Sequence, residues 1–260
     1  MCIPARECAH TVGEIVRALV ALREAGAIDE LVVVDAASGD GTAAAAESAG
    51  ASVLQEAELM PAYGPVLGKG DAMWRALSIL EGELVCFVDA DTEGFSAHFV
   101  TGLLGALVCE PGVSFAKAFY RRPLAADGDG GGRVNQLTAR PALALFYPEL
   151  AGVRQPLAGE VAARRDLLEA LPFATGYGVE VAMLIDVWRE LGLEGMAQVD
   201  LDEHRNRHQP LSALAPMALT VLATIARRLE QEGRLEQEGR VAEAAGAPVE
   251  RPPLRSLTVA

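Results

Sequence analysis

Two aspartates one residue apart, Asp89 and Asp91, stand where the apolar run at residues 84–88 ends. The run has the length and composition of a strand buried on both faces of a sheet. Residues i and i+2 of a strand point the same way, so the two carboxylates can converge on one cation or on a metal-bound phosphate. Mg²⁺ and Mn²⁺ prefer such oxygen ligands. Taken alone, the pair also fits the simpler interpretation that both aspartates cap the helix that follows.

The elements before this strand alternate between two periodicities. Strands are expected at residues 31–35, 52–54 and 84–88. Helices are expected at residues 12–22 and 69–80, and a third, alanine-rich helix should begin after Asp40, which could cap it. This β-α-β-α-β order predicts an α/β fold with a mainly parallel, three-layered sheet. Ligands of such sheets bind beyond the carboxyl ends of the strands. Asp35, Asp89 and Asp91 fall at those ends, which predicts the site there.

The second half of the chain is expected to add a strand at residues 113–120 and helices from residue 133, at 179–191 and after residue 211. The glycine-rich residues 125–132 predict an irregular loop, and the helical pattern breaks near residues 147–148. Alternation in residues 198–204 places Asp200, Asp202 and His204 on one strand face. A six-residue repeat at 229–234 and 235–240 predicts a solvated, frayed extension, with a partner-binding helix as the alternative, and the tail from Gly246 should be irregular.

Composition restricts the partners. With 22 basic and 36 acidic residues, the net charge of −14 excludes nucleic-acid binding through a general positive field. No continuous apolar run approaches the ~20 residues that span a bilayer, so no membrane partner is expected. Four cysteines without C-x-x-C spacing predict reduced thiols in a cytoplasmic protein. Residues 1–4 are no signal peptide and resemble the end of a strand whose beginning lies upstream of Met1.

Three local basic features remain as candidates for holding an anion. Lys69 lies at a glycine-flanked helix start, where it can hold phosphate or be an ordinary surface lysine. His204 begins a run of cationic and amide groups at residues 204–208 and is a natural further ligand for a carboxylate metal site, unless the run is an exposed polar loop. Arginines 121, 122 and 133 bracket the glycine-rich loop, where they grip a small anion or provide solubility.

Other chemistries lack their motifs. Residues 64–70 have the wrong glycine spacing for a P-loop and no Ser or Thr after the lysine, and no strand is followed by G-x-G-x-x-G. The chain contains no Gly-x-Ser-x-Gly elbow and no arguable Cys-His pair, which disfavours nucleophilic hydrolysis.

Several motifs, in their order along the chain, resemble one family of glycosyltransferases. They are Leu67-Gly68-Lys69-Gly70, Val88-Asp89-Ala90-Asp91, Lys117-Ala118-Phe119-Tyr120-Arg121-Arg122-Pro123, Gly130-Gly131-Gly132-Arg133-Val134, Gln155-Pro156-Leu157-Ala158-Gly159-Glu160, Gly176-Tyr177-Gly178-Val179-Glu180 and Glu203-His204-Arg205-Asn206. Together they resemble the glucosyl-3-phosphoglycerate synthases, a retaining GT-A family that includes mannosyl-3-phosphoglycerate synthases. The resemblance runs from Ile3 to about Arg207, and residues 250–253 look like the family's tail.

The resemblance implies a GT-A fold, with a Rossmann-like, mostly parallel sheet flanked by helices, a C-terminal acceptor-binding portion and a helical extension. Residues 1–120 would form the nucleotide-sugar-binding half, residues 121–228 the acceptor-binding and catalytic half, and residues 229–260 the extension.

The family's site residues carry over position by position. Asp91 and His204 would hold Mg²⁺ or Mn²⁺ on the donor diphosphate. The nucleotide sugar would contact Pro4, Ala5, Glu7, Asp35, Ser38, Lys69, Asp89, Ala90 and Tyr177, with Asp89 supporting the cation or contacting ribose. The 3-phosphoglycerate would be gripped by Gly132, Arg133, Asn135 and Asn206, where the family often has threonine in place of Asn135. The transferred sugar would lie near Leu157 and Glu180, which with Asp91 and Arg133 make the catalytic set.

One motif departs from the family. Related enzymes carry Pro-x-x-Asn-Glu, whose acid helps to recognise the donor base, and this chain has Glu7 and Cys8 at those two places. The departure leaves the donor base open between uridine and guanosine, with Glu7 as a possible substitute acid.

The implied reaction moves glucose or mannose from a nucleotide-diphosphate sugar to the 2-hydroxyl of 3-phosphoglycerate, with retention of configuration. Two alternatives stay open at this point: a GT-A transferase acting on a polysaccharide or lipid-linked acceptor, and a nucleotide-sugar-binding module without catalysis. The family also suggests a homodimer.

Overall fold

One seven-stranded sheet forms the centre of the protein, seen in a computed structural model that describes residues 1–123, 131–206 and 209–234. The strands lie in the order β3-β2-β1-β4-β6-β5-β7. They are β1 (Cys2–Ala5), β2 (Val32–Asp35), β3 (Ser52–Gln55), β4 (Leu84–Phe87), β5 (Phe115–Arg121), β6 (Val161–Arg164) and β7 (Met196–Glu203). The predicted α/β class and the predicted strands of the first half are confirmed.

Strand direction decides where the chemistry gathers. Strands β1 to β4 pair in parallel, and β5 pairs in parallel with β7. Strand β6 lies between β4 and β5 and runs antiparallel to both. All strands except β6 therefore end at one edge of the sheet, and β6 begins there. This edge carries Asp35 at the end of β2, Asp91 after β4, His204 after β7 and Glu160 just before β6.

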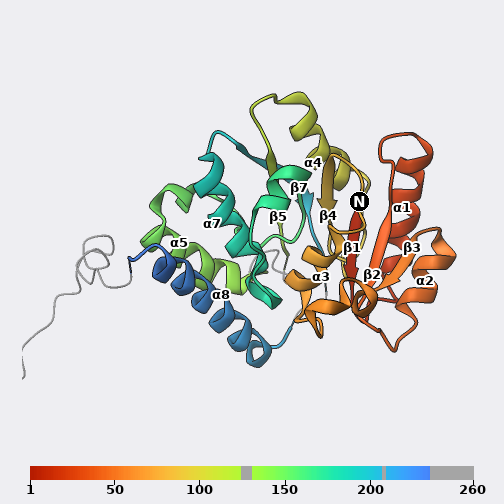
Figure 1. Cartoon of the computed structure of the whole chain (residues 1–260), viewed down its shortest axis with the longest axis horizontal. Coiled ribbons are helices and arrows are strands. Elements are labelled where there is room, and N and C mark those ends of the chain that lie inside the picture. The colour runs from red at the N-terminus through yellow and green to blue at the C-terminus, as the bar shows by residue number, and fades with distance from the viewer. Residues whose placement is uncertain (124–130, 207–208, 235–260) are drawn as a thin grey trace, which may run out of the picture.

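Helices cover both faces of the sheet. They are α1 (Val12–Glu24), α2 (Thr42–Ala49), α3 (Lys69–Ala76), α4 (His98–Cys109), α5 (Arg140–Phe146), α6 (Arg165–Ala170), α7 (Val179–Leu191) and α8 (Leu211–Gln231). Buried side chains of α1, α2 and α4 form a core on one face, and those of α3, α6 and α7 form a core on the other. A third core joins α5 and α8 to α7, at the end of the sheet away from α1 and α2 (Figure 1).

Several helix boundaries agree with the sequence prediction. Helix α7 has the predicted bounds, and the helical pattern from residue 133 becomes a π-helical turn at Asn135–Ala139 followed by α5, which ends just before Tyr147. Helix α3 ends at Ala76, earlier than predicted, and continues as turns. The N-cap of α2 is Gly41, and the Asp40 carboxylate accepts a hydrogen bond from the Thr42 N–H at 3.0 Å.

A bulge near the end of β7 overturns one prediction. The register between β5 and β7 shifts after Asp200, and Asp202 adopts a left-handed backbone with φ 62°. Such a bulge re-aims the residues that follow it. Leu201 and His204 are therefore buried while Asp200 and Asp202 are exposed. The prediction that Asp200, Asp202 and His204 share one face is wrong, because the extra residue breaks the strand's alternation.

Helix α8 differs from expectation in two ways. By length and composition α8 could cross a membrane, although the sequence was expected to contain no such segment. A single helix of this kind is weak evidence for a membrane span, because core helices pass the same test. Its inner face, with Val221, Ile225 and Leu229, is buried in the third core. The first copy of the repeat is thus packed rather than frayed, since Arg234 also bonds to the Phe146 carbonyl. The second copy, the tail from Gly246 and most of the glycine-rich loop lie outside the described residues.

Candidate functional site

Asp91 and His204 both lie at the carboxyl edge of the sheet, close enough for the charge of His204 to act on Asp91. The loops that carry them are tied together by the Glu93 N–H, which donates to the Arg205 carbonyl at 2.8 Å. The Asn206 amide donates to Asp91 Oδ2 at 3.3 Å. Burial and the neighbouring Asp89 raise the pKa of Asp91, while the charge of His204 opposes the rise. A carboxyl group in this setting favours a cation beside it.

The His204 imidazole is almost completely buried, with 2% of the residue exposed. Its Nε2 lies 3.0 Å from Glu160 Oε1 and 2.9 Å from Thr92 Oγ1. Its Nδ1 is buried and has no hydrogen-bond partner among the residues that the structure describes. Burial works against the imidazolium, but Glu160 outweighs it, so the pKa of His204 is raised. Burial works against the Glu160 carboxylate too, yet His204 and the Tyr120 hydroxyl bring its pKa down to about 2.

These two side chains fit a divalent cation. The free Nδ1 of His204 and the carboxylate of Asp91 are a nitrogen and an oxygen donor of the types that Mn²⁺ accepts. Residues 1–123, 131–206 and 209–234 contain no group of three or more His, Cys, Asp and Glu side chains arranged around one metal position. The protein would therefore supply few ligands and leave positions open for substrate phosphate, as is common for these ions.

A second cluster is built on Lys69, at the start of α3. Its Nζ lies 2.5 Å from Asp89 Oδ1 and 2.8 Å from Glu180 Oε1. Burial disfavours the ammonium group, but the two carboxylates outweigh it and raise the pKa of Lys69 well above its usual range. Gly159 lies directly against Asp89 and Lys69. The two aspartates of the motif thus have different partners: Asp89 pairs with Lys69, and Asp91 lies beside Asn206 and His204.

The expected nucleotide end lies where β2 ends. Asp35 is buried, and its Oδ2 accepts from the Ser38 N–H at 3.0 Å and from the Gln55 amide at 3.1 Å. Its Oδ1 has no hydrogen-bond partner in the described part of the chain. The Glu7 N–H donates to Ser38 Oγ at 2.9 Å, and Glu7 Oε1 accepts from the Gly39 N–H at 2.8 Å. Glu7 therefore orders the loop after β2.

The expected acceptor end is less complete. Asn135 is buried and its Oδ1 accepts from the Leu157 N–H at 3.2 Å, which joins an acceptor candidate to a donor-sugar candidate. Arg133 instead donates to the main-chain carbonyl of Gln209 at 2.6 Å. Gly132 has φ 66°, a left-handed conformation that favours glycine. The structure thus links Asn135 to the site and leaves Arg133 bonded to the segment before α8.

The remaining candidates lie around these groups. Pro4 and Ala5 are in β1, paired with Val34 and Asp35, and the Ala90 carbonyl accepts from Thr11. Tyr177 is 57% exposed beside the start of α7.

Sequence reasoning gave no role to three buried polar residues: Glu160, Tyr120 and Lys117. All three occur in the quoted motifs, but no spacing rule marks them. Lys117 Nζ donates to the Ala158 carbonyl at 2.8 Å, and burial lowers the pKa of Lys117 to about 8.

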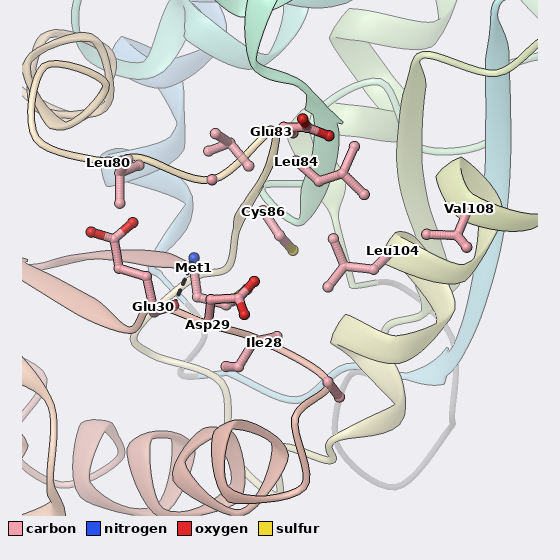
Figure 2. Close-up of a pocket in the computed structure, with 13 residues that line it drawn as sticks. Met1, Ile28, Asp29, Glu30, Leu80, Glu83, Leu84, Cys86, Leu104 and Val108 are labelled. Carbon is pink, nitrogen blue, oxygen red and sulfur yellow. Dashed lines mark hydrogen bonds between the residues drawn. The ribbon is translucent and has the colours of Figure 1, made fainter.

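A large hollow lies away from this site. This pocket has a volume of about 380 Å³. Its lining includes Met1, Glu30, Leu84, Leu104 and Val108 (Figure 2). It lies at the amino ends of β1 and β4, opposite the edge that carries Asp91 and His204. It contains none of the predicted site residues.

Comparisons with known proteins agree with the geometry. Residues 1–112 match the family model described as glycosyl transferase family 2. The glucosyl-3-phosphoglycerate synthase of Mycolicibacterium smegmatis is 45% identical over 87% of this chain and 76% of its own length. That of Petrotoga mobilis is 44% identical over 80% of this chain and 65% of its own length, so the chain spans just under two thirds of that relative.

Solved structures give the same result. The crystal structure of mannosyl-3-phosphoglycerate synthase from Rubrobacter xylanophilus has a TM-score of 0.84 and 53% identity, covering 90% of this chain and 74% of that one. The glucosyl-3-phosphoglycerate synthase from Mycobacterium tuberculosis, in complex with Mn²⁺, UDP-glucose and phosphoglyceric acid, has a TM-score of 0.80 and 38% identity. That alignment covers 96% of this chain and 80% of the other. The same enzyme has also been solved with Mg²⁺ and UDP.

Proposed function

Because this chain belongs to the glucosyl- and mannosyl-3-phosphoglycerate synthase family of glycosyltransferases, we propose that it transfers glucose or mannose to 3-phosphoglycerate. The donor would be a nucleotide-diphosphate sugar and the product a hexosyl-3-phosphoglycerate. The observation that carries the proposal is the edge of the sheet at which Asp91, the free Nδ1 of His204 and the Lys69 cluster meet. These groups suit a donor diphosphate beside a cation.

Each group has a defined task in the proposed reaction. Asp91 and His204 would hold Mg²⁺ or Mn²⁺, and the bound cation would neutralise the charge that develops on the departing diphosphate. Lys69 adds a positive charge to the same region and is kept charged by Asp89 and Glu180. Asp35 and Ser38 would order the nucleoside end of the donor, and Pro4, Ala5 and Glu7 lie beside them.

The chemistry exchanges one bond for another. The bond between the anomeric carbon and the diphosphate breaks, and the acceptor's 2-hydroxyl oxygen bonds to the same carbon on the same face. The hydroxyl proton passes to a diphosphate oxygen. A covalent intermediate would need a free carboxylate as nucleophile, and both Asp89 and Glu180 already pair with Lys69. We therefore infer that the substitution runs through a short-lived ion pair without a covalent intermediate. The preorganised charges of Lys69 and the proposed cation would stabilise the departing diphosphate.

A separate set of residues would position the acceptor. Gly132, Arg133, Asn135 and Asn206 would grip its phosphate and carboxylate, and Asn135 also holds the Leu157 main chain. Arg133 would exchange the Gln209 carbonyl for the acceptor's phosphate, a stronger, charge-assisted partner. We expect positioning of this kind to account for much of the rate.

An end-point assay tests the proposal. The protein is incubated with 3-phosphoglycerate, Mn²⁺ or Mg²⁺, and the uridine and guanosine diphosphates of glucose and of mannose in parallel. Formation of hexosyl-3-phosphoglycerate from any donor supports the acceptor and identifies the base that Glu7 and Cys8 allow. No product from all four donors would refute the acceptor. We further propose a cytoplasmic homodimer, which light scattering after gel filtration and cell fractionation would check.

A further inference from the structure

We propose that Glu160 is a positioning residue that holds the His204 imidazole with its proton on Nε2, so that the Nδ1 lone pair is the atom offered to the cation. The inference rests on the proposed metal-dependent function and adds the ligating atom and the group that sets it. Glu160 does not contact the reacting atoms, and its effect passes through His204.

The hydrogen-bond partners fix the proton. Glu160 is fully buried, and both oxygens of its carboxylate can only accept hydrogen bonds. Oε1 lies 3.0 Å from His204 Nε2, and Oε2 accepts from the Tyr120 hydroxyl at 2.8 Å. A bare Nε2 would place its lone pair against a carboxylate. The proton next to Glu160 therefore lies on Nε2, and when the ring is neutral its lone pair is on Nδ1, the atom without a partner among the described residues.

The faces of the ring are held as firmly as its edge. Tyr120 stacks on one side, with ring centroids 4.5 Å apart and an angle of 24°, and Phe99 lies on His204 at 6.3 Å and the same angle. Tyr120 thus stacks on the imidazole and also bonds to the carboxylate that orients it. These contacts restrict rotation that would exchange the two nitrogens.

The backbone supports the same geometry. Glu160 directly precedes β6, and its carbonyl accepts from the Ala118 N–H of β5 at 3.0 Å. The His204 N–H donates to the Arg121 carbonyl at 3.0 Å, immediately after the β7 bulge. Both side chains are therefore mounted on neighbouring parts of one sheet, which is what a preorganised metal ligand requires.

The first measurement is the tautomer of His204 in the metal-free protein. Long-range ¹⁵N–¹H correlation spectra distinguish a protonated Nε2 from a protonated Nδ1, and the His204 signals are assigned from their loss in His204→Gln. We expect protonation on Nε2. The spectra are recorded at a pH high enough for the ring to be neutral, and a neutral ring with its proton on Nδ1 in the folded wild type would overturn the inference without any assay of activity.

The second measurement is the affinity for Mn²⁺ alone, from the paramagnetic resonance signal of the free ion. We expect Glu160→Gln to weaken binding by roughly 10- to 100-fold, the usual effect of losing a partner of a metal ligand. Tyr120→Phe keeps the stacked ring and removes the hydroxyl, so it should weaken Mn²⁺ binding by a smaller factor. It also keeps the test available if Glu160→Gln fails to fold.

The chain provides a matched control pair. The Tyr147 hydroxyl donates to Glu232 at 3.0 Å, away from the site. This tyrosine-to-glutamate hydrogen bond is of the same kind as that from Tyr120 to Glu160. Glu232→Gln and Tyr147→Phe should leave Mn²⁺ affinity within twofold of the wild type. The inference is wrong if Glu160→Gln, still folded, also stays within twofold. A protein that shows the expected tautomer and metal affinities but makes no product from 3-phosphoglycerate would refute the proposed function and support this inference.

Discussion

The substitution Gly159→Ala tests whether the Lys69 cluster is rigid. Gly159 lies in the segment that leads into β6, and its backbone has no left-handed φ that would by itself exclude alanine. An added Cβ, however, would lie 2.6 Å from Lys69 Nζ and closer still to both carboxylate oxygens of Asp89. These groups cannot swing away freely, because Lys69 is also bound to Glu180 at 2.8 Å.

The expected effect follows from the size of the clash. Ordinary contact begins at 3.4 Å, so the methyl group and the cluster must separate by about 1 Å, a displacement that can cost on the order of 100-fold in rate. That factor equals about 2.7 kcal/mol of lost transition-state stabilisation. The free energy of unfolding should fall by ~1–3 kcal/mol, the usual cost of an extra methylene in a packed site.

The measurement is kcat/KM for the donor at saturating 3-phosphoglycerate, beside urea denaturation of each protein. Gly105→Ala in α4 is the matched control, because an added Cβ there meets no atom within 4 Å beyond its chain neighbours and the backbone of its own helix in the described structure. It should leave kcat/KM unchanged and stabilise the protein by up to ~1 kcal/mol through helix propensity. If Gly159→Ala kept kcat/KM within threefold of the wild type, the cluster would not be the rigid donor-binding element described above.

Three further predictions concern single side chains. Asp91→Ala should abolish turnover in the Mn²⁺-supported assay by removing a cation ligand, and full activity of this variant in the presence of a chelator would contradict the metal assignment. Arg133→Ala should chiefly raise the KM for 3-phosphoglycerate, by roughly 10- to 100-fold for a lost charged hydrogen bond, and an unchanged KM would contradict its role. Lys117, with its pKa lowered to about 8 from 10.5, binds fewer protons folded than unfolded, so wild-type stability should rise between pH 8 and pH 10.5. Lys117→Met should remove that rise, worth ~3 kcal/mol at most, and urea denaturation curves at pH 7 to 10 that shift in parallel for both proteins would contradict it.

Local periodicity was enough to predict the strands and helices of the first half of the fold, in which the strands pair in parallel. Strands β2 to β4 each contain a short apolar run, and Asp35 and Asp91 could be placed at one edge because parallel strands end together. The position of β6 could not be predicted in this way. Its pairing with β4 joins segments about 75 residues apart, and no local pattern encodes antiparallel insertion.

The site shows the same division. Lys69 was predicted from its glycine-flanked helix start, but its pairing with Glu180 spans 111 residues and follows from tertiary structure alone. The prediction that His204 shares a strand face with Asp200 and Asp202 was wrong, because a one-residue bulge breaks the strand's alternation. Glu160 carried no signal beyond its place in a motif, since its partner His204 is 44 residues away.

Strand β6 has a consequence for biosynthesis. Because it runs against its neighbours, the segment that completes the site enters the sheet from the edge at which the other strands leave. Thr92 and His204, which meet at the candidate site, are separated by 112 residues. At ordinary translation rates the ribosome therefore needs many seconds between making the first part of this site and the second. The amino-terminal strands can assemble during that interval through nearby contacts. The proposed cation could not act as a nucleus for folding during synthesis, because His204, its proposed ligand, is made only after the last strand of the sheet.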